Sequence, residues 1–420
     1  MKKLLIRLVA LFAVFILAGS CISCGKGDEN DTGAPIKIAM LFPLSGSAAS
    51  VGEDARMGFK LAMDYINDNG GIKSLGGRKI EVIFADTQSN EEAAAAEAER
   101  LITNEGVVAI AGCYQSAVTA SVQVVCERYQ TPLMITCSTG DMLTEGSHPF
   151  SYRIHEQNAS TGITQMAVIK SLMDEYGDIK TAALLYQNDD WGQALHAQWV
   201  EGLAELGIEV VVEDVFAEDA TDMTGTVSKV MAADPDIILN ACYFEPMVQL
   251  TNIMAGKNYA AKLNFCSSSG ETNTDFIPAV GNNADGFFTA SGWGFDVIEA
   301  KDQWWINDLC KEAFGEDLNA ETAAGWISAF VIVEGLEVGA SVDPIELNAA
   351  IKSLHISADA AWNMYPHDIE FDQTTGQNIH AMCVVGQFQD TQIKMVYPEI
   401  VRLPGVEPVY PASDLAPWNQ

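Results

Sequence analysis

The chain has 420 residues, of which 48% are hydrophobic, so it is long enough for two domains of ordinary size and too apolar for a disordered protein. Its 57 acidic residues outnumber its 23 basic residues and give a formal net charge of −34 at pH 7. Such an acidic chain repels nucleic acid and anionic membrane surfaces, so neither is expected as an electrostatic partner.

Residues 1–20 predict a secretory signal peptide, because basic residues precede the apolar run from Leu8 to Leu17 and small residues follow it. The run is shorter than the roughly 20 residues of a membrane-spanning helix. The small residues lead directly to Cys21 and resemble a bacterial lipobox, in which the cysteine is lipidated and becomes the mature N-terminus. Cys24 is a second candidate. We expect a lipid anchor at Cys21, a flexible tether over residues 21–35, and an extracytoplasmic location at a bacterial membrane.

After Pro35, apolar strand patterns alternate with helical patterns. Strands are predicted at 36–42, 79–85, 107–111 and 133–136, and helices at 51–69, 89–104 and from about Ser116 onward. Ser89 to Glu92 has the spacing of a capping box. The alternation is typical of a doubly wound α/β domain.

The same alternation then restarts. Helices are predicted at 161–176, 192–206, 224–233, 246–255, 300–314, 322–339 and 344–354, and strands at 181–186, 209–216, 236–240, 262–266 and within 369–397. No linker rich in Pro, Gly or Ser separates the halves. The pattern predicts two doubly wound α/β lobes that face each other across a ligand cleft, with hinge closure as the response to ligand. We expect a first lobe of 36–157 plus 287–366, a second of 158–286 plus 367–405, and a C-terminal tail of 406–420.

Two predicted strands end in small polar residues. Strand 107–111 is followed by Ser116 at the start of a helix, and strand 133–136 by Cys137, Ser138 and Thr139. Ligands bind outside the carboxyl ends of parallel strands, and a helix N-terminus favours an anion. The two loops could therefore hold a carboxylate, although helix capping explains the same residues equally well.

The chain resembles the periplasmic leucine/isoleucine/valine-binding proteins of ABC transporters, the type I solute-binding family, over nearly its whole mature length. The resemblance rests on Pro43-Leu44-Ser45-Gly46, Gly70-Gly71-Ile72, Ser116, Thr139, Asn188-Asp189-Asp190-Trp191-Gly192, Phe371-Asp372 and Val396-Tyr397-Pro398. It implies two lobes and a substrate-capturing lipoprotein that works with a membrane permease and needs no cofactor or metal.

The resemblance implies a ligand site made by Ser116, Cys137, Ser138, Thr139, Trp191, Tyr243, Glu245 and Trp293. Ser116 and Thr139 would bind the α-carboxylate of an amino acid, and Glu245 its ammonium group. Trp191 would cover the ligand after closure. Two alternatives stay open: Trp191 as a core aromatic residue, and Glu245 as a solvated acid.

An amino acid is therefore the expected ligand of a monomeric binding protein. A sensor or binding protein for amides, urea or another small polar solute is the alternative. Enzymatic function is not expected, since the chain has no G-x-S-x-G or H-E-x-x-H pattern and its six histidines show no metal-ligand spacing. The seven cysteines after Cys24 are an odd number in apolar surroundings, which favours buried thiols over a disulfide framework.

Overall fold

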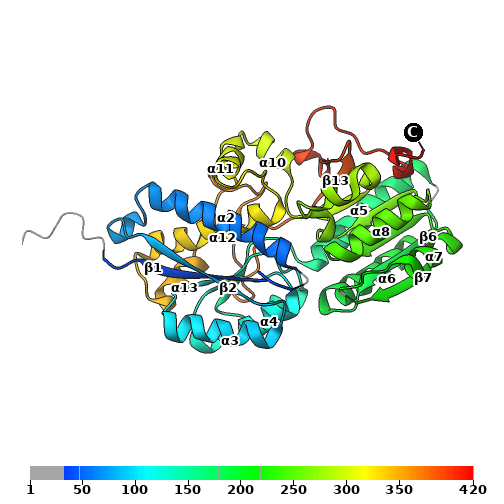
Figure 1. Cartoon of the computed structure of the whole chain (residues 1–420). Helices are drawn as coiled ribbons and strands as arrows, with labels where there is room; N and C mark the ends of the chain where they lie inside the picture. Colours follow the sequence, from blue (N-terminus) through cyan, green and yellow to red (C-terminus); the bar gives the residue numbers. More distant parts are fainter. Residues whose placement is uncertain (1–32, 47, 178, 218, 420) are drawn as a thin grey trace, which may run out of the picture.

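The computed structural model describes residues 33–46, 48–177, 179–217 and 219–419 of the chain. The predicted signal peptide and the predicted lipidation site Cys21 lie outside the described residues. The described chain forms two lobes side by side, each with its own sheet and with helices on both faces of it (Figure 1). The two-lobed α/β architecture predicted from the sequence is confirmed.

The first lobe is built on a five-stranded parallel sheet in the order β2-β1-β3-β4-β5. Its strands are β1 (Ile36–Phe42), β2 (Ile80–Asp86), β3 (Ile110–Gly112), β4 (Leu133–Ile135) and β5 (Ser151–Arg153). Its helices are α2 (Ala49–Asp68), α3 (Glu91–Arg100), α4 (Ser116–Tyr129), α11 (Trp304–Phe314), α12 (Ala320–Gly339) and α13 (Pro344–Lys352). In Figure 1, α2 and α12 lie on one side of this sheet and α3 and α4 on the other. Helices on both sides explain why β1 is buried almost throughout.

Helices α2 and α12 pack backbone against backbone. A Cβ atom on Gly58 of α2 would overlap the carbonyl oxygen of Thr322, and one on Gly325 of α12 would overlap that of Ala55. By length and composition α12 could cross a membrane, but 78% of its apolar window is buried inside the protein. It is therefore apolar around its whole circumference because it is a core helix.

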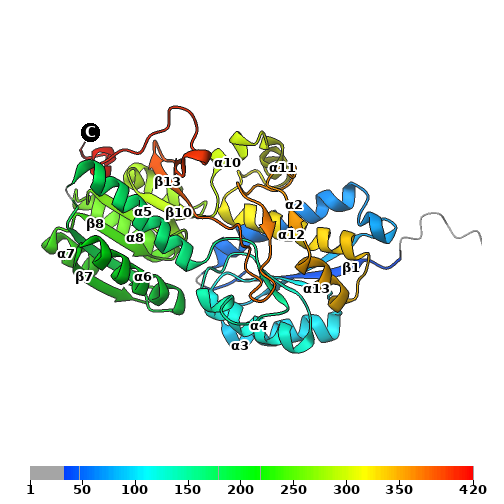
Figure 2. The ribbon, with the colours of Figure 1, turned by 180° about the vertical axis from the view of Figure 1, so that it is seen from behind.

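The second lobe is built on a seven-stranded sheet in the order β14-β13-β10-β9-β8-β6-β7. Its strands are β6 (Thr181–Gln187), β7 (Glu209–Phe216), β8 (Ile237–Ala241), β9 (Leu263–Cys266), β10 (Phe288–Ser291), β13 (Val384–Gln389) and β14 (Gln392–Tyr397). Its helices are α5 (Asn158–Tyr176), α6 (Asp190–Leu206), α7 (Thr224–Ala233), α8 (Phe244–Gly256), α9 (Phe276–Val280) and α10 (Phe295–Ala300). Strands β13 and β14 are antiparallel, and the others are parallel. Figure 2 shows this lobe from behind, with β13 beside β10.

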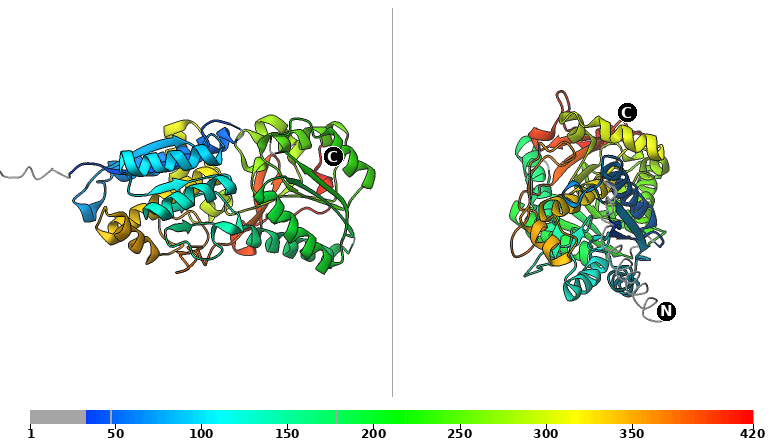
Figure 3. Two further views of the ribbon diagram at one scale, coloured as in Figure 1. Left: turned by 90° about the horizontal axis from the view of Figure 1, so that it is seen from below. Right: turned by 90° about the vertical axis from the view of Figure 1, so that its left-hand side faces the viewer.

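The chain passes between the lobes after β5, after α10 and after the short strand β12 (Ile369–Glu370). Figure 3 shows the two lobes from below. The predicted boundaries at 287 and 367 are wrong. Strand β10 pairs with β9 and β13, so it belongs to the second sheet. Strand β12 pairs with β11 (His355–Ile356), and Gln377 bridges Arg153, so the segment after 367 first completes the first lobe. Strands this short contain no signal that specifies which sheet they join.

Three predicted elements also differ in detail. The strand predicted over 107–111 is confined to Ile110–Gly112. The helix predicted over 300–314 begins only at Trp304, as α11, because a separate helix, α10, ends at Ala300 and a turn in which Asp302 has a φ of 55° follows it. The cap of α3 is Asn90, whose side chain accepts a hydrogen bond from Ala93 N, and not Ser89. The predicted tail packs on the second lobe, where Ala412 N donates to Lys262 O at 2.7 Å.

Candidate functional site

The loops after β3 and β4 are joined by hydrogen bonds at the edge of the first sheet. Gly140 N donates to Ser116 Oγ at 3.1 Å, and Ser138 Oγ donates to Tyr114 O at 2.9 Å. Ser138 is 1% exposed, so its side chain joins the two loops and is not open to a ligand. Thr139, between these two contacts, is half-buried at the lobe interface.

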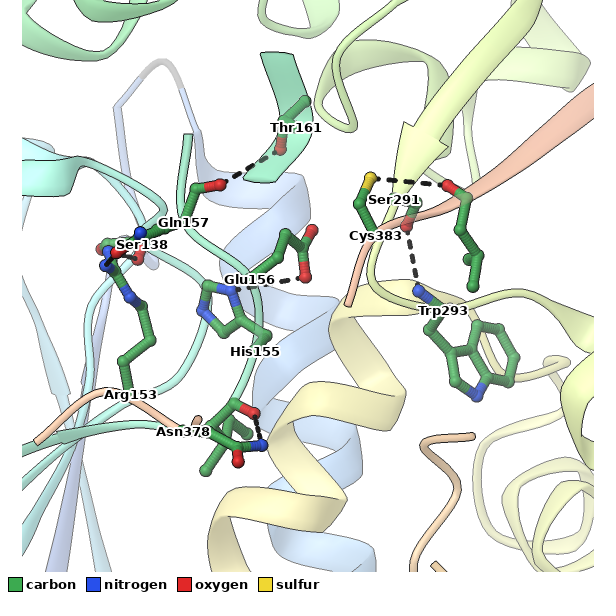
Figure 4. A network of polar contacts seen from close by, with 12 residues as sticks. Ser138, Arg153, His155, Glu156, Gln157, Thr161, Ser291, Trp293, Asn378 and Cys383 are labelled. Carbon is green, nitrogen blue, oxygen red and sulfur yellow. Dashed lines mark hydrogen bonds and ion pairs between the residues drawn. The ribbon is translucent and has the colours of Figure 1, made fainter. Parts of the chain in front are cut away.

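Arg153 holds the loop after β4 through hydrogen bonds to its backbone carbonyl groups. Its Nη1 donates to Gly140 O at 2.7 Å and to Ser138 O at 3.3 Å, and its Nε donates to Gln377 Oε1 at 2.6 Å. Burial lowers the pKa of Arg153 to about 10, so the guanidinium stays charged at neutral pH. In Figure 4 its guanidinium points toward Ser138 and Gln157. The position of the loop that contains Thr139 therefore depends on a buried cation.

Three aromatic rings form a contact between the lobes, one from the first lobe and two from the second. The ring of Tyr114 lies 5.4 Å from that of Tyr243, which stacks on Trp191 at 5.4 Å with an interplanar angle of 7°. The hydroxyls of Tyr114 and Ser269 are hydrogen-bonded across the cleft at 2.9 Å. Trp191 is 6% exposed, as expected for the alternative that it is a core aromatic residue. It also borders a pocket between the lobes. The two lobes are thus in direct contact through side chains at the predicted ligand positions.

A cavity of about 50 Å³, called here the inner cavity, lies on one side of these rings. It is lined by Tyr114, Thr136, Cys137, Thr139, His155, Glu156, Ser268, Ser291, Gly292, Trp293, Ala320, Glu321, Ala324 and Tyr365. These residues come from the loops after β3, β4 and β9, from the end of β10 and the loop after it, from the first crossing of the chain, from α12, and from the loop between β11 and β12. The inner cavity is therefore enclosed by both lobes, as the binding site of a two-lobed protein must be.

A second pocket of about 330 Å³, called here the outer pocket, is bordered by Ser116 of the first lobe and Trp191 of the second. Ser116 and Thr139, the two residues expected to share a carboxylate, thus line different spaces. Their loops remain adjacent through the hydrogen bond to Ser116 Oγ. Cys137 and Trp293 line the inner cavity with Thr139.

Glu245 does not lie in the site. It is exposed in the first turn of α8, whereas Tyr243 just before it is buried. Glu271, in the loop after β9, is 2% exposed and belongs to the second lobe. Its carboxylate accepts hydrogen bonds from Ser268 N at 2.7 Å and from Thr289 Oγ1 at 2.7 Å. The expectation for Glu245 is wrong because α8 begins at Phe244, directly after Tyr243, and Glu245 lies exposed in its first turn.

Two further buried glutamates, Glu156 and Glu321, line the inner cavity and were not identified from the sequence. Glu156 follows β5 in the first crossing, and Glu321 lies in the first turn of α12. Burial raises the pKa of Glu156 to about 7 and that of Glu321 to about 8. The only sequence signal concerned Glu321, an acid at the start of an apolar helix. An acid is common at this position in any helix, because its charge interacts favourably with the helix dipole.

The structure brings two histidines and one acid together on the surface, although sequence spacing indicated no such group. One ligand atom from each of His355, Glu370 and His380 lies within 4.8 Å of the others. His355 Nε2 is 3.0 Å from Asp368 Oδ2, and His380 Nε2 is 3.2 Å from Glu370 Oε2. These contacts pair each histidine with a carboxylate, which accounts for the grouping.

Comparison with known proteins identifies the family. A profile of the family described as periplasmic binding protein matches residues 35–391. Leu/Ile/Val-binding protein homolog 8 of Brucella melitensis is 25% identical over 376 residues, which cover 87% of this chain and 91% of that protein. Leu/Ile/Val-binding protein homolog 7 of the same organism is 25% identical over 425 residues, which cover 95% and 99%.

Solved structures share the fold. The leucine binding protein LivK from Thermotoga maritima has a TM-score of 0.74 at 20% identity and covers 86% of this chain and 97% of its own. LivJ from Streptococcus pneumoniae, in complex with isoleucine, has a TM-score of 0.75 at 21% identity and covers 87% and 100%. A solute binding protein from R. palustris, in complex with benzoate, has a TM-score of 0.73 at 18% identity and covers 89% and 100%. The chain belongs to the type I periplasmic binding proteins of the branched-chain amino acid family, which are solute-binding proteins and not enzymes.

Proposed function

We propose that this protein is the lipid-anchored, extracytoplasmic binding component of an ABC uptake transporter, and that it captures an amino acid by closure of its two lobes. The observation that supports this most is the inner cavity, which is lined by Thr139 of the first lobe together with Ser268 of the second. A ligand held between them favours the closed form, because only that form provides both sets of contacts. The closed form is the one that a membrane permease would recognise.

Thr139 is proposed to bind the ligand's carboxylate, together with the backbone of Cys137. Both residues line the inner cavity, and the loop that contains them is held by Arg153. Ser116 would act indirectly, through its hydrogen bond from Gly140 N. Hydrogen bonds to a charged carboxylate in a site closed to water are strong and directional, which would select against ligands without an acid group.

Tyr243 and Trp191 are proposed to close the cleft, with Trp293 as the aromatic wall near the hinge. Trp293 is 5% exposed and lines the inner cavity. Because Glu245 is exposed, the ammonium group of the ligand would be bound instead by the buried Glu271 of the second lobe.

A thermal-shift screen of the chain from Gly25 onward tests the proposal, since every described helix and strand lies in that segment. The screen contains the twenty amino acids, small amides and urea. A ligand that binds only the folded state, at one hundred times its dissociation constant, stabilises it by about 2.7 kcal/mol. We expect amino acids to raise the melting temperature and Thr139→Ala to remove the rise. Ser228→Ala, at an exposed site on α7, is the matched control.

The alternative function is binding or sensing of amides, urea or another small polar solute. The benzoate complex of the R. palustris protein supports a wider ligand range for this fold than amino acids. A screen in which only amides or urea raise the melting temperature would favour this alternative, and the amino acid proposal would then be abandoned.

A further inference from the structure

The inner cavity presents more unpaired acid than the ammonium group of one simple amino acid requires. Oε2 of Glu156 and Oε2 of Glu321 have no hydrogen-bond partner among the described residues. The two residues are only 3% and 5% exposed, and both line the inner cavity. Burying a carboxylate oxygen without a partner is costly, so a site that contains two of them is built for a group that is not part of the chain.

The lining of the inner cavity supplies no cation to match these acids. Among the described residues that line it there is no Lys or Arg. His155 Nδ1 is 3.8 Å from Glu156 Oε2, but burial lowers the pKa of His155 to about 3, so the ring is neutral at pH 7. Arg153 is bonded to the loop carbonyls of Ser138 and Gly140. Figure 4 shows Glu156 reaching toward Ser291 and Cys383, away from the guanidinium of Arg153.

The site for Glu156 is shaped to hold its carboxylate. A Cβ atom on Gly292 would overlap Glu156 Oε2, so a glycine directly after β10 leaves the space that this oxygen occupies. Glu321 is held from the other lobe, where Thr272 Oγ1 donates to its Oε1 at 3.1 Å and leaves Oε2 without a partner. Glu156 is thus enclosed by packing and Glu321 is held through one oxygen, and Oε2 of each has no partner among the described residues.

Aromatic rings surround the same space. Tyr114, Trp293 and Tyr365 line the inner cavity and are at most 9% exposed. Ring faces attract cations, and the attraction is strongest where water is excluded. Carboxylates and aromatic faces together, without Lys or Arg, are the composition expected of a site for organic cations.

We propose that the ligand carries a cationic nitrogen in addition to any α-ammonium group, and that Glu156 and Glu321 hold this nitrogen in the inner cavity. The N–H groups of an ammonium or amidinium would donate to Oε2 of each glutamate. This inference rests on the proposed function, and it replaces a branched-chain or other apolar side chain by a basic one.

The charged neighbours of the two glutamates determine their protonation. Those that act on them are Arg153 near Glu156, and Asp54 and Glu271 near Glu321. Burial is the largest cause of the raised pKa values, so without a bound cation Glu321 is mostly protonated at pH 7 and Glu156 is about half protonated. A bound cation favours the ionised forms, and binding of a cation should therefore release protons.

The experiment is isothermal titration calorimetry of the chain from Gly25 onward at pH 7, in phosphate and in Tris buffer. The cationic probes are L-lysine, L-ornithine and putrescine, and the comparison probes are L-norleucine, which lacks the distal amine of lysine, and benzoate. We expect at least one cationic probe to bind more tightly than norleucine and benzoate, with a heat that changes between the buffers in the direction of proton release. Glu156→Gln and Glu321→Gln should each weaken that binding roughly 10- to 100-fold, as for a lost hydrogen bond to a charged group. Both substitutions keep the shape of the side chain, and a thermal melt of each variant verifies folding.

Glu201→Gln, at an exposed glutamate on α6, should leave the affinity unchanged. Norleucine or benzoate binding at least as tightly as every cation, or no effect of the two substitutions, overturns the inference while the proposed function stands. If none of the probes binds and the amino acid screen also gives no shift, both the inference and the proposed function fail.

Discussion

Replacing Glu321 by Gln should change how the stability of the unliganded protein depends on pH. The carboxyl group of Glu321 has its pKa raised by burial from 4.5 to about 8, so between these values the folded state holds a proton that the unfolded state has lost. Stability contributed by a group of this kind is present at low pH and is lost as the pH rises through the folded pKa. Glutamine resembles the protonated side chain and does not titrate, so the variant lacks this loss.

The size of the effect follows from the two pKa values. Going from 4.5 to about 8, at about 1.4 kcal/mol per pH unit, the wild-type protein should lose up to about 5 kcal/mol relative to the variant. The full value is an upper limit, because opening of the cleft hydrates Glu321 at a lower cost than unfolding. Burial also raises the pKa values of Glu156 and Asp54, whereas it lowers that of His155. The comparison of variant with wild type removes these shared contributions.

Urea unfolding at pH 5, 6, 7, 8 and 9 measures the effect as the difference in free energy of unfolding between Glu321→Gln and wild type. The difference should move in favour of the variant as the pH rises, by several kcal/mol over the series. Glu201→Gln, on the surface of α6, is the control and should follow the wild-type curve at every pH. Parallel curves for Glu321→Gln and wild type would refute the reasoning, since they would mean that Glu321 titrates equally in the folded and unfolded states.

Three other substitutions test how the site is supported. Arg153→Met should destabilise the protein by about 3 to 5 kcal/mol in urea unfolding, because it leaves buried oxygens without donors, and it should weaken binding at Thr139. Gly58→Ala should cost about 1 to 3 kcal/mol, because the added Cβ overlaps Thr322 O between α2 and α12, and a lowered melting temperature measures it. Tyr114→Phe removes the hydrogen bond to Ser269 across the cleft, so it should disfavour the closed form by about 1 kcal/mol and raise the radius of gyration in solution scattering.

The fold could be predicted largely from the sequence because its elements are long and strongly periodic. The strand over 209–216 and the helix over 224–233 have the predicted bounds, since each is set by a local apolar pattern and local end signals. Strands β10 and β12 could not be assigned to the correct lobe from the sequence. The correct assignment depends on their pairing with β9 and β11, which is a tertiary property. The same limit explains the error in the lobe boundaries.

The site was predicted less completely. Thr139 and Trp293, two of the predicted ligand-binding residues, line one cavity, and their binding of a ligand stays a prediction. The resemblance implies Glu245 as the ammonium partner from its position along the chain, but α8 begins at Phe244 and Glu245 is exposed in its first turn. Glu156 and Glu321 were missed because a buried acid has no sequence signature of its own, since only the tertiary structure removes it from water.

The buried acids also bear on why the lobes would close on one ligand and not on another. Glu156 and Glu321 are buried between the lobes, and one oxygen of each has no partner among the described residues, so the proposed closure would move both groups out of water. With a neutral ligand, the closed form must take up protons on these groups or bear the cost of desolvating their charges. A ligand with a cationic nitrogen offsets this cost only in the closed form, where its N–H groups reach both carboxylates at once. Selectivity would then arise from the closure step itself, because a ligand can shift the equilibrium between open and closed forms only by its difference in affinity for the two.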